Sequence, residues 1–184
     1  MTTDINREKN RLRKEIKIIK DNIPYSEKKL RSKSIWEKIE KDTIFQASKI
    51  VLIYWSMKDE VFTHDFVEKW HEDKKILLPV VDGNTLLLKQ YNGIESMKKG
   101  ELFNILEPTG QEFTDTNSID LIIVPGVAFD KENNRMGRGK AYYDKLLQTT
   151  SCPKYGVCFN FQYLDKIPTE QHDIKMDRII VLEK

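Results

Sequence analysis

One stretch of the chain gathers the residue types that bind phosphate. Residues 120–130 read Asp-Leu-Ile-Ile-Val-Pro-Gly-Val-Ala-Phe-Asp, and residues 135–144 read Arg-Met-Gly-Arg-Gly-Lys-Ala-Tyr-Tyr-Asp. The apolar run Leu121–Val124 is typical of a buried strand, and Pro125-Gly126 ends it. Glycines let a backbone approach a ligand closely, free N–H groups at a helix start favour anions, and three cations add positive charge. The segment therefore predicts a phosphate-binding loop after a strand.

Two common phosphate-binding motifs are absent from this loop. A Walker A motif would need glycine at Asn134 and Ser or Thr at Ala141, and a dinucleotide-binding motif would need a third glycine at Tyr142. The alternative interpretation is a surface loop whose cations are simply solvated. Three cations among closely spaced glycines favour anion binding.

A second segment, residues 54–63, leaves a predicted strand as Tyr-Trp-Ser-Met-Lys-Asp-Glu-Val-Phe-Thr. An aromatic wall with a carboxylate suits a flat heterocycle that carries N–H donors, because stacking supplies contact area and the carboxylate accepts hydrogen bonds. Trp55 and Glu60 are therefore candidate ligand-binding residues. The alternative, a Trp55 packed in the core and a solvated Glu60, fits the composition equally well.

Two more groups of charged residues are weaker signals. Lys9 and Arg13 lie one turn apart on a predicted helix, where a solvated basic face is the usual arrangement. A carboxylate in residues 167–173, Ile-Pro-Thr-Glu-Gln-His-Asp, is a candidate to help Asp144 hold a divalent cation. His172 beside an aspartate is weak evidence for a base. With no nucleophile–base motif visible, chemistry by positioning and electrostatics is favoured.

The composition bounds the class of protein. The 184 residues are 39% hydrophobic and 33% charged, which is typical of a globular protein, and we expect a single domain over residues 1–184. A net charge of +2 gives no support for nucleic-acid binding, and no apolar run is long enough for a membrane span or a signal peptide. Two cysteines suggest neither a disulfide framework nor a zinc site, and Cys158 is expected in the core. We expect a cytoplasmic protein that is a monomer or weak dimer.

The elements that must position these residues alternate along the chain. Helices are predicted at 4–21, ended by Pro24; after Ser26 as N-cap; after Thr63 as N-cap; and near 138–149. Strands are predicted at 49–55, 75–81, 86–91, 121–125, 155–159 and 178–182, with a hairpin turn at 82–84 and irregular structure over 92–119. This alternation predicts an α/β layered domain with a mostly parallel sheet, whose ligands bind beyond the carboxyl ends of the strands.

These segments, in this order, resemble the 5-formyltetrahydrofolate cyclo-ligase (methenyltetrahydrofolate synthetase) family over nearly the whole chain. The resemblance rests on the Lys-x-x-x-Arg of the first helix and on matching motifs at 55–63, 78–80, 124–130, 135–144, 159–162 and 167–173. The family usually has glycine at the position of Ala141. A methyl group there would narrow the loop if this residue needs a positive φ.

The resemblance implies an ATP- and magnesium-dependent ligase of one-carbon metabolism. It would convert 5-formyltetrahydrofolate to 5,10-methenyltetrahydrofolate and release ADP and phosphate. The formyl oxygen would attack the γ-phosphate, and N10 would then attack the imidate phosphate, so the substrate supplies both nucleophiles. The implied fold is the three-layer α/β type shared with sugar-phosphate isomerases and coenzyme A transferases.

The resemblance also implies roles for residues of this chain. ATP would be surrounded by Lys9, Arg13, Arg135, Gly137, Arg138, Gly139, Lys140 and Tyr143. Arg138 and Lys140 would be catalytic through the charge of the γ-phosphate. Trp55 and Glu60 would bind the folate, with Glu60 on the pterin donors and Tyr142 near the junction of the two ligands. Asp144 and Asp173 would hold magnesium.

Two other functions remain as alternatives. A sugar-phosphate isomerase-like enzyme would need a base beside the sugar and no ATP, and the segments at 55–60 and 135–144 argue against it. A folate- or nucleotide-binding protein without turnover would result if Ala141 disables the loop.

Overall fold

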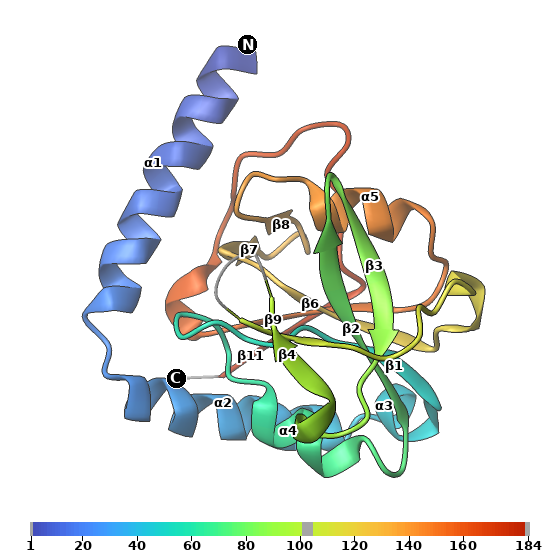
Figure 1. Cartoon of the computed structure of the whole chain (residues 1–184). Helices are drawn as coiled ribbons and strands as arrows, with labels where there is room; N and C mark the ends of the chain where they lie inside the picture. The colour runs from blue at the N-terminus through green and yellow to red at the C-terminus, as the bar shows by residue number, and fades with distance from the viewer. Residues whose placement is uncertain (1, 101–104, 183–184) are drawn as a thin grey trace.

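A six-stranded sheet forms the centre of the computed structural model, which describes residues 2–100 and 105–182 (Figure 1). The strand order is β11-β9-β6-β1-β2-β3. The strands are β1 (Ile50–Leu52), β2 (Lys75–Asp82), β3 (Thr85–Gln90), β6 (Leu121–Pro125), β9 (Lys154–Cys158) and β11 (Arg178–Val181). All neighbours are parallel except β3, which forms an antiparallel hairpin with β2. The predicted mostly parallel sheet is confirmed.

The helices α2 (Tyr25–Glu40), α3 (Thr43–Ala47), α4 (His64–Trp70) and α5 (Tyr142–Gln148) cover the two faces of this sheet, whereas α1 (Thr2–Asp21) packs elsewhere. Because side chains alternate along a strand, Val51 packs with Trp36 of α2 in one core cluster, whereas Leu52 packs with Leu146 of α5 in another. Figure 1 shows α2, α3 and α4 on one side of the sheet and α5 on the other, so the domain has the three expected layers.

A small second sheet lies beyond β6 and supports helix α1. Its strands β7 (Ala128–Asp130), β8 (Arg135–Met136) and β10 (Tyr163–Leu164) pair in the order β10-β7-β8. Ile16 of α1 packs against Met136 in a third core cluster. The buried carboxylate of Asp130 accepts hydrogen bonds from the backbone N–H groups of Asn134 and Ile167, which fixes the turn before β8. This sheet therefore brings α1 beside the glycine-rich loop.

The sequence misplaced several element boundaries. The helix expected near 138–149 begins only at Tyr142, because Ala141 has a left-handed backbone with φ 54°. Ser26 is not an N-cap, since α2 begins at Tyr25 directly after Pro24. The strand expected at 49–55 is the shorter β1.

The segment expected to be irregular contains regular structure in its described part. Strands β4 (Met97–Lys99) and β5 (Leu106–Pro108) form an antiparallel pair, and short 3-10 turns occupy η1 (Ile94–Ser96) and η2 (Thr116–Ser118). A third 3-10 turn, η3 (Asn160–Gln162), follows β9. None of the helices that the structure describes is long and apolar enough to cross a membrane.

Candidate active site at the carboxyl edge of the sheet

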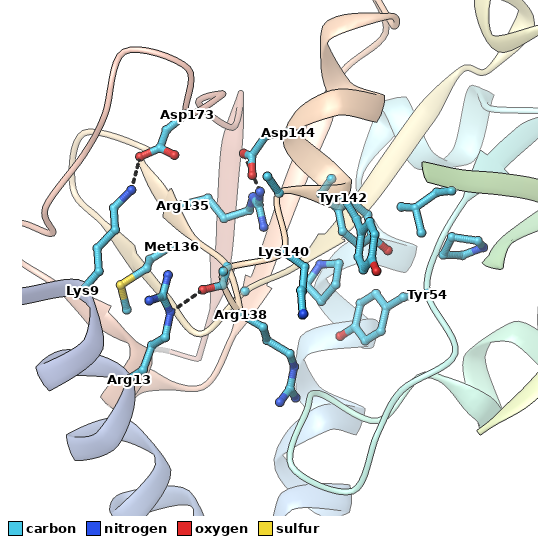
Figure 2. Close-up of a pocket in the computed structure, with 18 of the residues that line it drawn as sticks. Lys9, Arg13, Tyr54, Arg135, Met136, Arg138, Lys140, Tyr142, Asp144 and Asp173 are labelled. Carbon is cyan, nitrogen blue, oxygen red and sulfur yellow. Dashed lines mark hydrogen bonds and ion pairs between the residues drawn. The ribbon is translucent and has the colours of Figure 1, made fainter. Parts of the chain in front are cut away.

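A pocket of about 570 Å³ lies where β1, β2 and β6 end (Figure 2). Its walls come from α1, the segment after β1, the β2–β3 hairpin, the loop before α5 and the segment after β10. Every residue that the sequence singled out lines it: Lys9, Arg13, Trp55, Glu60, Arg135, Gly137, Arg138, Gly139, Lys140, Tyr142, Tyr143, Asp144 and Asp173. The structure thus assembles the predicted set in one place, as expected for the carboxyl edge of a parallel sheet.

The glycine-rich loop, residues 135–142, owes its path to unusual backbone angles. Gly139 has φ 94° and Ala141 has φ 54°. A left-handed backbone costs an L-residue roughly 1–2 kcal/mol, so Ala141 stores strain in the loop. A Cβ atom at Gly137 would lie 2.8 Å from a guanidinium nitrogen of Arg135, so a side chain there would require the Arg135 guanidinium to shift.

Helix α1 is fastened to this loop. The Arg13 side chain donates from Nε to the carbonyl oxygen of Gly137 at 2.9 Å and from Nη1 to Asn10 at 2.8 Å. Lys9 is only 5% exposed, and its ammonium bonds Glu170 at 2.9 Å and Asp173 at 2.7 Å. The interpretation of a solvated basic face is therefore wrong for Lys9.

The acidic group that Lys9 contacts is also a candidate metal site. Glu170, His172 and Asp173 each offer a ligand atom, and these atoms lie within 4.8 Å of one another. Asp144 lies outside this group. Carboxylate oxygens are suitable ligands for magnesium, and in this structure Lys9 neutralises them.

Two arginines of the loop are paired with carboxylates of the pocket. Arg135 is 5% exposed and donates to Asp144 at 2.6 Å. Arg138 extends in another direction (Figure 2) and donates to Asp59 at 2.7 Å and to Glu60 at 3.0 Å. Glu60 is thus not the solvated carboxylate of the alternative interpretation. The predicted phosphate-binding loop and the predicted heterocycle-binding segment are in direct contact.

Lys140 differs from the other cations of the site. Its ammonium makes no hydrogen bond or ion pair with any residue that the structure describes, although the side chain lines the pocket. A cation without a carboxylate partner is immediately available to an anion.

Hydrogen bonds and ring stacking also hold the segment after β1. The Ser56 N–H donates to the Thr63 hydroxyl, and the Thr63 N–H donates to the Ser56 hydroxyl, each at 3.0 Å. The Trp55 ring stacks on His64 with ring centres 3.8 Å apart. Burial lowers the pKa of His64, which favours its neutral form beside Trp55.

Glu60 accepts from the Met57 N–H at 2.9 Å, so its carboxylate is oriented by its own loop. Thr63 lies at the N-cap position of α4 as predicted, but its hydroxyl accepts a hydrogen bond from the Ser56 N–H and not from the helix.

Two buried polar atoms in the pocket wall lack a partner among the described residues, Nε of Arg135 and the hydroxyl of Tyr143. The Arg135 guanidinium lies 5.7 Å from the centre of the Tyr143 ring. Burial raises the pKa of Tyr143, so its hydroxyl keeps its proton as a donor. Buried donors without acceptors are costly in a folded protein and are characteristic of binding sites.

Two acidic contacts of the site escaped the sequence analysis. Asp59 received no role, although it binds Arg138, because that contact joins residues 79 positions apart. Glu170 was given no individual role, although it lies in the motif at 167–173 and shares Lys9 with Asp173. The motif at 167–173 places Glu170 near the site, whereas no local sequence pattern predicts a role for Asp59.

Comparisons with known proteins give matches to one family. A profile of the 5-formyltetrahydrofolate cyclo-ligase family matches residues 5–182. A 5-formyltetrahydrofolate cyclo-ligase of Haemophilus influenzae is 32% identical over 73% of this chain and 76% of its own length. The mouse cyclo-ligase is 29% identical over 96% and 94%, respectively.

Two solved structures share the fold. The solution structure of the 5,10-methenyltetrahydrofolate synthetase of Aquifex aeolicus gives a TM-score of 0.85 at 32% identity and covers 94% of this chain and 89% of that one. A synthetase of the same name from Mycoplasma pneumoniae gives 0.75 at 26% identity, covering 94% and 98%.

Proposed function

Because the chain belongs to the 5-formyltetrahydrofolate cyclo-ligase family, we propose that both substrates of its reaction meet in the pocket at the carboxyl edge of the sheet. The enzyme converts 5-formyltetrahydrofolate and ATP to 5,10-methenyltetrahydrofolate, ADP and phosphate. One observation carries the assignment of the pocket: the phosphate-type loop and the aromatic, acidic segment contact each other through Arg138 and Glu60.

The nucleotide occupies the side formed by α1 and the loop. Arg13, Gly137 and Gly139 shape this wall, and Lys9 and Arg135 add charge. Arg138 and Lys140 act on the γ-phosphate, where negative charge is redistributed in the transition state. Preorganised cations at that point lower the barrier without any covalent step on the protein.

Asp144 and Asp173 would hold magnesium, with Glu170 beside Asp173. The donor set fits the ion chemically, because Asp173 and Glu170 offer oxygen atoms close together and Asp144 offers another in the same pocket. Bound there, the ion would neutralise phosphate charge. The same carboxylates contact Lys9 and Arg135, which keeps these cations beside the phosphate site.

The folate occupies the side formed by the segment after β1. Glu60 accepts hydrogen bonds from the pterin, Trp55 supplies an apolar wall, and Tyr142 lies between the two ligands. The enzyme aligns the formyl oxygen with the γ-phosphate and excludes water. The acidic residues that line the described pocket are paired with cations. This pairing fits a reaction without a protein base.

We infer a cytoplasmic location for the enzyme. The free thiols of Cys152 and Cys158 support it, because a reducing compartment keeps thiols unpaired. We infer that the enzyme works there as a monomer or weak dimer, which sedimentation at working concentration would test.

The proposal is tested by turnover. Purified protein is mixed with 5-formyltetrahydrofolate and magnesium, with and without ATP, and the near-ultraviolet absorbance of the methenyl product is followed. An ATP-dependent rise is expected, and its loss in Lys140→Ala would assign the reaction to this pocket. Tight binding of both ligands without product would indicate a binding protein, and Ala141→Gly would then be measured for recovery.

A further inference from the structure

A buried lysine lies behind the contact between the two halves of the site. Lys20, in the last turn of α1, has a side chain only 3% exposed, and its ammonium faces one carboxylate oxygen of Asp59 at 3.5 Å. The other oxygen of Asp59 accepts from Arg138 at 2.7 Å. Neither Lys20 nor Asp59 lines the pocket. Asp59 therefore joins a buried cation outside the site to a cation inside it.

We propose that Lys20 and Asp59 are positioning residues that let Arg138 exchange Glu60 for the phosphate of ATP, so that the two substrates promote each other's binding. This inference rests on the proposed function. It adds a coupling between the nucleotide and folate sites, together with two residues that set it.

When Arg138 moves from Glu60 to the phosphate, each charged group of this cluster still has a partner. In the structure two cations, Lys20 and Arg138, serve two carboxylates, Asp59 and Glu60. When Arg138 moves to a phosphate, Asp59 keeps Lys20, and Glu60 is free for the pterin donors. The 3.5 Å contact is longer than the ordinary 2.7–2.9 Å of a charged hydrogen bond, so the Lys20 contact has room to tighten.

Lys20 is placed to strengthen its contact with Asp59 when Arg138 moves away. Burial lowers its pKa, while the carboxylate of Asp59 opposes this effect. For Asp59 burial acts upward, but Lys20 and Arg138 outweigh it and lower its pKa, so the carboxylate stays charged. The Asp59 side chain is 33% exposed and contacts two cations, so an Asp59 without Lys20 would hold Arg138 more tightly.

The Glu60 carboxylate cannot accept hydrogen bonds fully from both Arg138 and the pterin. One of its oxygens accepts from Arg138 at 3.0 Å, and the other accepts from the Met57 N–H at 2.9 Å. Pterin donors must therefore compete with Arg138. Folate that displaces Arg138 from Glu60 makes this arginine available to ATP, and ATP that binds Arg138 makes Glu60 available to folate. By linkage, each ligand changes the affinity for the other by the same factor.

The test is a set of binding measurements on the whole enzyme. The dissociation constant of a non-hydrolysable ATP analogue with magnesium is measured by calorimetry with and without 5-methyltetrahydrofolate, which lacks the formyl oxygen. In the unaltered protein we expect the folate to tighten nucleotide binding by about 5- to 50-fold, within the usual range of coupling between sites. Equal affinities with and without the folate overturn the inference. Binding of neither ligand would instead overturn the proposed function.

Variants separate positioning from simple structural support. Lys20→Gln is expected to weaken nucleotide binding about 5- to 10-fold and to reduce the coupling, while folate affinity without nucleotide changes less than about twofold. Adding Asp59→Asn should restore nucleotide binding, because it removes the carboxylate that then retains Arg138. Lys14→Gln is the matched control, since Lys14 is an exposed lysine of the same helix. No recovery in the double variant, or equal behaviour of Lys20→Gln and Lys14→Gln, overturns the inference.

Discussion

The two walls of the pocket are built in different ways. The loop at 135–142 has a strained backbone, with positive φ at Gly139 and Ala141, and its Arg138 is ion-paired with Asp59 and Glu60 of the opposite wall. The segment at 54–64 shares these ion pairs, but its own path is fixed by neutral contacts, namely reciprocal hydrogen bonds between Ser56 and Thr63 and a stacked ring pair.

This difference matches the work proposed for each wall. Ion pairs can be exchanged for ligand charges at little net cost, so the cations of the loop can turn to a charge that moves during phosphoryl transfer. Packed rings and satisfied backbone groups keep one geometry, which suits recognition of a flat pterin. The loop is expected to govern turnover, and the segment is expected to govern folate affinity. Four predictions test this division.

The largest effect is expected for Lys140→Ala. Removing a cation that acts mainly in the transition state should lower kcat by about 100- to 1000-fold and leave the folate dissociation constant within about twofold. Initial rates of methenyl formation and equilibrium folate binding provide the two numbers. Lys145→Ala is the control, because Lys145 bonds the Asn84 carbonyl oxygen and is not part of the pocket. Unchanged turnover in Lys140→Ala would remove this residue from the mechanism.

Glu60→Ala should act on the other wall. Loss of a charged acceptor is expected to weaken folate binding by about 10- to 100-fold, since hydrogen bonds to charged groups contribute about 1.5–3 kcal/mol. Nucleotide affinity should not fall, because Arg138 loses a competing carboxylate. Calorimetry with each ligand separates the two effects, and Glu132→Ala, an exposed glutamate of the turn at 131–134, serves for comparison. Normal folate affinity together with reduced nucleotide affinity would contradict the assignment.

The strain of the loop should be visible in stability. Ala141→Gly is expected to raise the free energy of unfolding by about 0.5–1 kcal/mol, because relief of the left-handed strain exceeds the added entropy of glycine in the unfolded chain. Gly139→Ala should lower it, since φ is 94° there. Urea unfolding measures both. A destabilised Ala141→Gly would show that the methyl group at 141 contributes more by packing than it costs in strain.

The smallest effect concerns pH and the segment at 54–64. The pKa of His64 is lowered from 6.5 by burial, so below about pH 6.5 the unfolded chain binds a proton that the folded protein resists. The contribution of His64 to stability is therefore present above pH 6.5 and is lost as the pH falls below it. Unfolding free energies between pH 5 and pH 7.5, about the titration range of histidine, should fall less steeply in His64→Gln. An unaltered slope in His64→Gln would show that His64 titrates normally.

The sequence was most informative where local pattern and chemistry coincide. Periodic apolar residues predicted the sheet strands, and the residues given roles on the matching motifs all line the pocket. It failed where long-range geometry decides. The left-handed angle at Ala141 delays α5 by several residues, and nothing local marks Asp59 as the partner of Arg138. The β4–β5 pair was missed because its strands are three residues each and lack clear alternation.

The most direct measurement is a crystal structure of the enzyme with a non-hydrolysable ATP analogue, magnesium and 5-formyltetrahydrofolate. The account predicts the γ-phosphate within hydrogen-bond reach of Lys140 and Arg138, the pterin on Glu60, and the formyl oxygen facing the γ-phosphorus. A nucleotide bound away from residues 135–142, or a pterin that leaves Glu60 paired with Arg138, would contradict it.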